Sequence, residues 1–288
     1  MTGSFAANLP NDDRVQIHNR LIPGPTGEPS VPVRIYAPAT RVGNVPGLLY
    51  IHGGGFTIGN LDMEDGVCRQ IVRDVGCVVV SVDYRLAPKH PFPAAPEDCY
   101  AALIWMATNA EPLGIDPARI GVRGGSSGGG LCAAVTLMAR DRKTPPLIFQ
   151  MPLYACLDNQ HETPSSHQMA ANDMIWGRPL SLRGWKAYLG EEGSASAYAT
   201  PARAEDLSGL PPAYIMVGEL DLLRDENIAY ATRLMQAGAP TELHVYPGAF
   251  HGFEGMVKQA DVSVRAVNEV TTALKRELWG RSVGEEPG

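Results

Sequence analysis

Residues 121–130 read GVRGGSSGGG and join a strand-like segment, RIGVRG at 119–124, to a helix-like segment, LCAAVTLMARD at 131–141. In a G-x-S-x-G turn between a strand and a helix, the serine hydroxyl projects from the carboxyl end of the strand, where open α/β sheets bind their ligands. A phosphate-binding loop with a following lysine is disfavoured because the chain contains no Gly-Lys pair. We therefore predict a turn that presents a nucleophilic serine. The pattern fits both Ser126 and Ser127 and does not choose between them.

The segments on both sides of this turn alternate between strand-like and helix-like patterns. Such alternation predicts an α/β fold, in which a mostly parallel central sheet is covered by helices on both faces. The predicted strands are 31–38, 47–51, 77–84, 119–124, 147–154, 212–219 and 241–248, and the predicted helices are 62–76, 94–109, 131–141, 226–238 and 260–279. Residues 157–205 interrupt the alternation with polar loops and aromatic residues, which predicts a cap or lid over the strand ends. We expect residues 1–288 to form one catalytic domain.

The composition disfavours several classes of function. The 288 residues carry a net charge of −7 at pH 7, which argues against nucleic acid or an anionic membrane as the main partner. The N-terminal residues lack the basic flank and apolar run of a signal peptide, and no apolar run approaches the ~18 residues of a membrane helix. The five cysteines form no C-x-x-C pair, which favours buried reduced thiols over disulfides or a metal site. We expect a cytoplasmic protein without membrane insertion.

A nucleophilic serine needs a general base, and the base needs an acid that orients it. His251 lies in GAFHGF, between the last predicted strand and the last predicted helix. Asp221 comes directly after strand 212–219, where a carboxylate can reach a histidine on the neighbouring loop. Asp225 is the alternative acid, but we expect it to begin the next helix, where a carboxylate is favoured. The order serine, aspartate, histidine is that of hydrolases with such a turn.

A second glycine-rich motif, HGGGF at 52–56, follows the predicted strand 47–51. Consecutive glycines let backbone N–H groups approach a substrate and stabilise the oxyanion of a tetrahedral intermediate. An HGGG-type loop upstream of a G-x-S-x-G turn supplies this oxyanion hole in lipases and esterases. We expect His52 itself to brace the loop rather than to act as a base. The two motifs together predict an acyl-transfer serine hydrolase.

With these motifs the chain resembles the hormone-sensitive-lipase-like bacterial carboxylesterases, and within them the heroin-esterase-like enzymes. The resemblance extends from about Val15 to Trp279. It depends on HGGGF (52–56), DYRLAPKHPFPAA (83–95), IGVRGGSSGGGL (120–131), ELDLLRDE (219–226) and PGAFHGF (247–253). It implies an α/β-hydrolase fold with a helical cap and hydrolysis of short-acyl carboxylic esters, without a cofactor or a metal. It also implies a possible homodimer through the edge strand near TELHVYPG and the last helix.

The resemblance assigns roles to individual residues. The implied catalytic residues are the nucleophile Ser126, the acid Asp221 and the base His251. The implied oxyanion-hole donors are the backbone N–H groups of Gly54, Gly55 and Ser127, so Ser127 supplies an amide and not a hydroxyl. Candidate substrate-pocket residues are Phe56, Met174, Trp176, Trp185 and Tyr188, although aromatic residues serve equally well in packing the cap.

Three positions depart from the family pattern. Gly125 stands before the nucleophile where a polar residue is usual, which predicts a more flexible turn. Leu222 stands after the acid where proline is usual. Strand-like sequence begins by about Val15, so the family's first cap helices are expected to be absent, and a reduced cap is expected to come mainly from 157–205. We expect a more open entrance to the site.

Two other functions fit the same motifs. An amide-directed hydrolase of the arylformamidase type shares the triad and a similar glycine loop. A non-catalytic ligand receptor on the same fold is also possible, although such receptors lack the histidine that is present here as His251. Rates on small esters and activated amides separate these functions.

Overall fold

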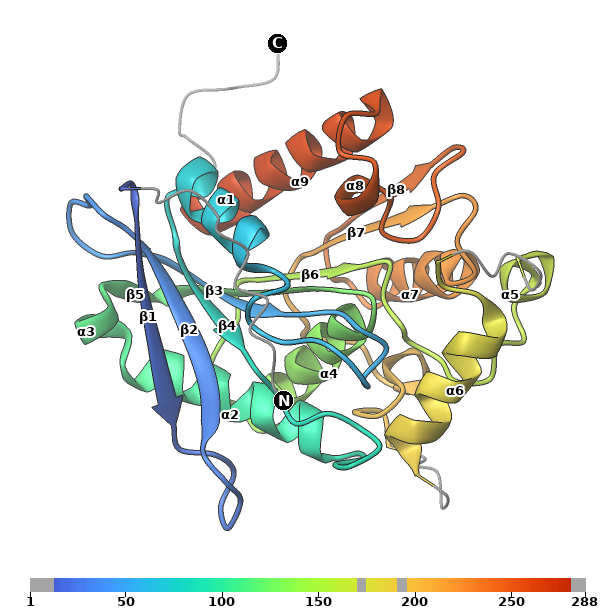
Figure 1. The fold of residues 1–288 in the computed structure, drawn as a ribbon, viewed down its shortest axis with the longest axis horizontal. Helices are drawn as coiled ribbons and strands as arrows, with labels where there is room; N and C mark the ends of the chain where they lie inside the picture. The colour runs from blue at the N-terminus through green and yellow to red at the C-terminus, as the bar shows by residue number, and fades with distance from the viewer. Residues whose placement is uncertain (1–12, 170–174, 191–195, 281–288) are drawn as a thin grey trace, which may run out of the picture.

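The computed structural model describes residues 13–169, 175–190 and 196–280, and they are built around a sheet of eight strands (Figure 1). The strands are β1 (Val15–Ile22), β2 (Val31–Pro38), β3 (Val45–Ile51), β4 (Val78–Val82), β5 (Ile115–Gly125), β6 (Phe149–Leu153), β7 (Ala213–Gly218) and β8 (Thr241–Tyr246). Their order across the sheet is β1-β2-β4-β3-β5-β6-β7-β8. β2 pairs antiparallel with both β1 and β4, and every other pairing is parallel. The predicted mostly parallel sheet is therefore confirmed.

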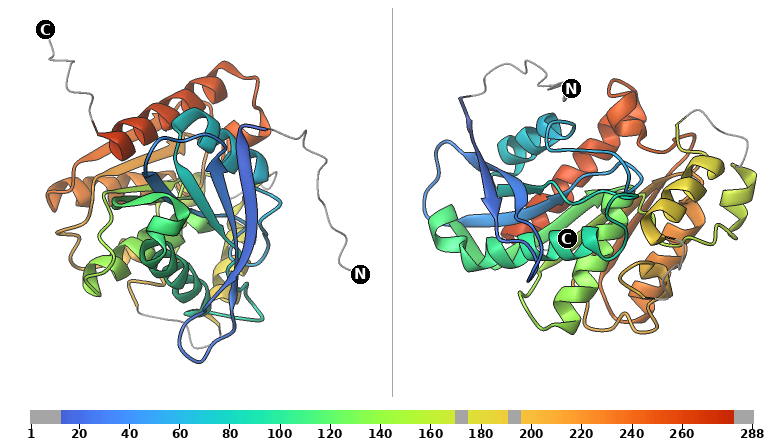
Figure 2. Two further views of the ribbon diagram at one scale, coloured as in Figure 1. Left: turned by 90° about the vertical axis from the view of Figure 1, so that its left-hand side faces the viewer. Right: turned by 60° about the horizontal axis from the view of Figure 1, so that its bottom comes forward.

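Helices cover both faces of the sheet, as the two views of Figure 2 show. The helices are α1 (Asp65–Val75), α2 (Ala94–Thr108), α3 (Ala110–Leu113), α4 (Ser127–Asp141), α5 (Pro164–Gln168), α6 (Arg178–Leu189), α7 (Arg224–Gln236), α8 (Phe253–Met256) and α9 (Asp261–Trp279), with a 3₁₀ turn η1 (Pro201–Arg203). Buried residues of α1 and α9 share one apolar core with one face of the sheet, while α2, α4 and α7 pack on the other face. The inner strands β3 and β4 are almost wholly apolar, because both of their faces are buried.

The glycine run after the two serines is helical, which differs from the prediction. The helix was expected to begin at residue 131, but α4 begins at Ser127. Packing explains the difference. A Cβ added at Gly128, Gly129 or Gly130 would come within 2.2, 2.8 and 2.1 Å of other atoms, most of them backbone. These glycines therefore let the first turn of α4 lie directly against neighbouring strand ends. This close packing offsets the low helix propensity of glycine.

The segment 157–205 contains α5, α6 and η1 and no strand among its described residues. Helix α6 packs closely against the loop that follows β3: a Cβ added at Gly184 would lie only 3.0 Å from the carbonyl oxygen of Gly55. No helix among the described residues is long and apolar enough to cross a membrane.

Candidate active site

The turn from β5 to α4 holds Ser126 in a strained backbone conformation, with φ of 58° and ψ of −124°. Close backbone contacts enforce it. A Cβ at Gly124 would lie 2.1 Å from the carbonyl oxygen of Gly128, and a Cβ at Gly128 would lie 2.2 Å from that of Ile51. Strain that the surrounding structure imposes in this way is typical of functional sites. The turn therefore has the geometry expected for a nucleophile elbow.

A continuous chain of hydrogen bonds runs from Ser126 through His251 to Asp221. The Oγ atom of Ser126 lies 2.9 Å from Nε2 of His251, and Nδ1 of His251 lies 2.8 Å from Oδ2 of Asp221. The carboxylate of Asp221 is buried, and its Oδ1 accepts a hydrogen bond of 3.0 Å from the N–H of Leu223. If Nδ1 donates to the carboxylate, Nε2 is left to accept the serine proton. The three side chains have the arrangement of a Ser–His–Asp triad.

The structure brings Ser126, and not Ser127, to the histidine. The side chain of Ser127 is fully buried, and its Oγ has no hydrogen-bond partner among the described residues. As the first residue of α4, Ser127 can still contribute its backbone N–H. The pair of serines that the sequence pattern left ambiguous is thus separated by the fold.

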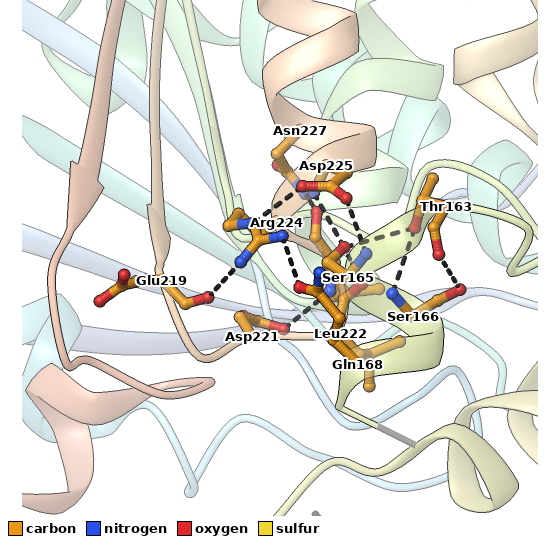
Figure 3. Close-up of polar contacts among 11 residues, drawn as sticks. Thr163, Ser165, Ser166, Gln168, Glu219, Asp221, Leu222, Arg224, Asp225 and Asn227 are labelled. Carbon is orange, nitrogen blue, oxygen red and sulfur yellow. Dashed lines mark hydrogen bonds and ion pairs between the residues drawn. The ribbon is translucent and has the colours of Figure 1, made fainter.

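Asp225, the alternative acid, has other partners (Figure 3). Its Oδ2 accepts a hydrogen bond of 2.7 Å from the N–H of Ser165, and its Oδ1 accepts one of 2.8 Å from Nε of Arg224. Burial alone would raise the pKa of Asp225, but the hydrogen bonds from Arg224 and Ser165 outweigh burial and lower it. Asp225 lies in the first turn of α7, as expected. It ties α5 to the first turn of α7, while the carboxylate hydrogen-bonded to His251 is that of Asp221.

Leu222 stands where the family pattern has proline, and Ser165 of α5 also holds this residue in place. The hydroxyl of Ser165 donates a hydrogen bond of 2.9 Å to the carbonyl oxygen of Leu222, as Figure 3 shows. The side chain of Leu222 is buried in the core shared with α2 and α4. The loop is therefore fixed by packing and by Ser165 without a proline ring.

The glycine loop after β3 lies against the nucleophile turn. A Cβ at Gly53 would meet the carbonyl oxygen of Gly125 at 3.0 Å and Cβ of Ser126 at 3.4 Å. Gly54 and Gly55 have φ of 120° and 58°, a region that favours glycine. Neither of their N–H groups donates a hydrogen bond to any of the residues that the structure describes, so both are available to a substrate oxygen.

His52 braces this loop. Its ring stacks on Tyr84 with centroids 4.2 Å apart, its Nδ1 lies 2.7 Å from the carbonyl oxygen of Gly53, and its own carbonyl accepts a hydrogen bond from the Tyr84 hydroxyl. Burial lowers the pKa of His52, which favours the neutral imidazole. This agrees with the structural role expected for it.

The candidate pocket residues occupy two different places. Phe56, Trp185 and Tyr188 form one buried aromatic cluster in which Phe56 stacks on Tyr188 at 4.0 Å, and it attaches α6 to the glycine loop. Trp176 instead stacks on His251 with centroids 6.0 Å apart, and its Cη2 would lie 2.4 Å from a Cβ at Gly55. Trp176 therefore lies at the reacting groups. Met174 lies outside the described residues.

Sequence reasoning missed three residues at the site. Cys156 places its Sγ 3.9 Å from the Ser126 hydroxyl, and burial raises the pKa of this thiol. Tyr154 lies edge-on to His251 and hydrogen-bonds to Glu254. Their only sequence signals are their positions: Tyr154 and Cys156 come just after β6, and Glu254 comes three residues after His251. Within the described residues, no group of His, Cys, Asp and Glu side chains could hold a metal ion.

Comparison with known proteins agrees with this geometry. A family model described as the alpha/beta hydrolase fold matches residues 48–255. Esterase LipI of Mycobacterium tuberculosis is 38% identical over 274 residues, which are 94% of this chain and 85% of that protein. Carboxylesterase NlhH of the same organism is 37% identical over 268 residues, which are 92% of this chain and 83% of that protein.

Solved structures extend the comparison to the whole fold. A bacterial heroin esterase superposes with a TM-score of 0.92 and is 46% identical, covering 96% of this chain and 88% of its own. Esterase LipW of Mycobacterium marinum superposes with a TM-score of 0.86 and is 37% identical, covering 93% of this chain and 83% of its own. The chain therefore belongs to the α/β-hydrolase family, among its hormone-sensitive-lipase-like esterases.

Proposed function

We propose that the protein is a serine carboxylesterase that hydrolyses short-acyl carboxylic esters, with Ser126 as nucleophile, His251 as general base and Asp221 as the orienting acid. The observation that carries the proposal is the hydrogen-bond chain through these side chains, with separations of 2.9 and 2.8 Å. Such distances are within reach for proton transfer. The esterase names of the relatives support the same reaction class.

The proposed reaction uses this arrangement of side chains and N–H groups. His251 takes the proton from Ser126 as Oγ attacks the ester carbonyl, and the oxyanion that forms is stabilised by the N–H groups of Gly54, Gly55 and Ser127. The imidazolium then protonates the departing alcohol and leaves an acyl-enzyme. Water attacks the acyl-enzyme with His251 again as base, and the acid and the free serine are released. Asp221 holds the imidazole in the required tautomer throughout.

The proposed preference for short acyl chains depends on the cap. We assign this role to residues 157–205 within a single domain, because α6 packs on the oxyanion loop and Trp176 lies against both Gly55 and His251. An indole at this place leaves little room for bulky groups beside the reacting carbonyl. Phe56, Trp185 and Tyr188 would then shape the pocket indirectly, through their buried cluster. The homodimer and the cytoplasmic location stay predictions from the sequence.

Hydrolysis of p-nitrophenyl esters from acetate to octanoate tests the proposal, together with a p-nitroanilide and an arylformamide. We expect the wild type to prefer short esters. Asp221→Asn should lower kcat by about 10⁴-fold through the wrong histidine tautomer. Asp225→Asn makes the same change four residues away, on a carboxylate bonded to Ser165, and should keep activity within about tenfold.

The two serines form a second matched pair. Ser126→Ala should lower kcat by at least about 10³-fold, because the nucleophile is lost. Ser127→Ala retains the backbone N–H and should keep most activity. Full activity in Ser126→Ala would overturn the assignment, and a wild type that prefers the formamide would favour the amide hydrolase.

A further inference from the structure

Tyr154 lies next to the nucleophile turn and is fixed to it through the backbone. It follows β6, where its N–H donates a hydrogen bond of 2.7 Å to the carbonyl oxygen of Met216 in β7. The residues around it bond Ser126 directly: Leu153 accepts from the Ser126 N–H at 3.0 Å, and Cys156 donates to the Ser126 carbonyl at 3.0 Å. The position of Tyr154 relative to the proposed nucleophile is therefore set by backbone hydrogen bonds of its neighbours.

The phenol ring of Tyr154 contacts both the nucleophile turn and the histidine. It meets the His251 ring in a T-shaped arrangement, with centroids 5.0 Å apart and planes 72° apart, a favourable aromatic geometry. On the other side, a Cβ at Gly125 would lie 3.0 Å from the Tyr154 hydroxyl oxygen and 3.1 Å from Cε2. Ring and glycine thus fit each other closely. The ring lies where it can limit movement of the imidazole.

Glu254 holds the far end of this ring. It lies three residues after His251, in the short helix α8, and its Oε1 accepts a hydrogen bond of 2.6 Å from the Tyr154 hydroxyl. Burial raises the pKa of Glu254, while the Tyr154 hydroxyl and the buried cation of Arg123 favour its ionised form. The contact links the histidine loop back to β6.

We propose that Tyr154 and Glu254 are a positioning pair that holds the imidazole of His251 at Ser126. The Tyr154 ring packs between the nucleophile turn and His251, and Glu254 binds the hydroxyl of this ring to the histidine loop. This inference depends on the proposed function, in which His251 acts on Ser126. Neither residue contacts the reacting atoms in the mechanism above. The pair acts by keeping the distance and direction of the Nε2–Oγ contact.

The test uses Tyr154→Phe, which removes only the hydroxyl, Glu254→Ala, which removes the acceptor, and Glu254→Gln, which retains an acceptor oxygen. The matched control is Tyr100→Phe. Tyr100 lies in α2, and its hydroxyl donates a hydrogen bond of 2.6 Å to the carbonyl oxygen of Thr144, away from the catalytic residues and the cap. For each variant we would measure kcat and KM on p-nitrophenyl acetate, the melting temperature, and the downfield NMR proton of the His251–Asp221 hydrogen bond.

We expect Tyr154→Phe and Glu254→Ala each to lower kcat about tenfold, with KM within about twofold, because a small misplacement of catalytic groups reduces rate more than binding. The double variant should be no slower than either single variant, since both break one contact. Glu254→Gln should recover most of the rate, and Tyr100→Phe should match the wild type. The downfield proton should shift or broaden only in the two slow variants and their double.

Three results would overturn the inference: kcat within twofold of the wild type in Tyr154→Phe and Glu254→Ala, losses that multiply in the double variant, or an unchanged downfield proton in the slow variants. A wild type without esterase activity would instead contradict the proposed function. In that case the downfield proton would still decide whether the pair positions His251.

Discussion

A single methyl group at Gly55 should disable the site through Trp176. Gly55 has φ of 58°, where an L-residue is strained by about 1–2 kcal/mol. The Cβ of Gly55→Ala would lie 2.4 Å from Cη2 of Trp176, about 1 Å inside an ordinary contact. The same indole stacks on His251, so relief of the clash moves either the Gly55 N–H or the groups around the histidine. A displacement of about 1 Å at reacting groups costs about a hundredfold in rate, and we expect that loss in kcat/KM on p-nitrophenyl acetate.

The control for backbone strain is Gly248→Ala. Gly248 has φ of 71° in the turn after β8, with open space around its added Cβ. This variant should lose about 1–2 kcal/mol of stability and no activity. Adding Trp176→Ala to Gly55→Ala removes the clash and should recover at least about tenfold in kcat/KM over Gly55→Ala alone, a coupling of ordinary size for residues in contact. The reasoning is refuted if Gly55→Ala stays within twofold of the wild type, or if the two substitutions combine without recovery.

Three further predictions concern stability and thiol chemistry. Asp98 is fully buried and bonds the Arg85 guanidinium at 2.8 Å through both carboxylate oxygens. Asp98→Ala should destabilise the fold by about 1–3 kcal/mol in urea unfolding, because the Arg85 side chain and backbone N–H lose this acceptor and Arg85 keeps only its ion pair with Glu28. Burial lowers the pKa of His161 to about 4 from 6.5. The unfolded chain therefore binds this proton more tightly, and the stability that His161 contributes above pH ~6.5 is lost as the pH falls toward 4. Wild type should lose more unfolding free energy than His161→Gln between these pH values. All five cysteines are buried as free thiols, so a thiol reagent should react slowly with the native protein and titrate five groups after denaturation; fast reaction of the native protein would contradict the structure.

The sheet and the main site could be read from the sequence because their signals are local. Ser126, Asp221 and His251 each follow a strand, and parallel strands bring their carboxyl ends to one edge of the sheet. The expectation that Asp225 belongs to the next helix depended on a helix-start signal within a few residues, and α7 begins at Arg224. Turn chemistry and strand positions were sufficient for Asp221 and His251, whereas the choice of Ser126 over Ser127 came from the family resemblance.

Other parts depend on contacts that no local pattern records. Tyr154 and Glu254 are 100 residues apart, and only the fold brings them together. Helices α5 and α8 have five and four residues, too short for a helical periodicity to appear. Trp176 lies in a segment without a clear sequence pattern, so pocket lining and cap packing were equal alternatives for it, and its contact with Gly55 could not be predicted. Tertiary packing decided each of these cases.

Gly125 shows how tertiary packing can reverse a local expectation. A glycine before the nucleophile predicts a loose turn, because glycine loses more conformational freedom than any other residue on folding. The turn is nevertheless held at both ends of Ser126: the N–H bonds Leu153, and the carbonyl accepts from Gly130 and Cys156 at 3.1 and 3.0 Å. The space beside Gly125 is filled by the phenol of Tyr154. A polar side chain at 125 would displace that ring from His251. Because Gly125 has no side chain, the Tyr154 ring, which follows β6, can pack against the turn and make it rigid.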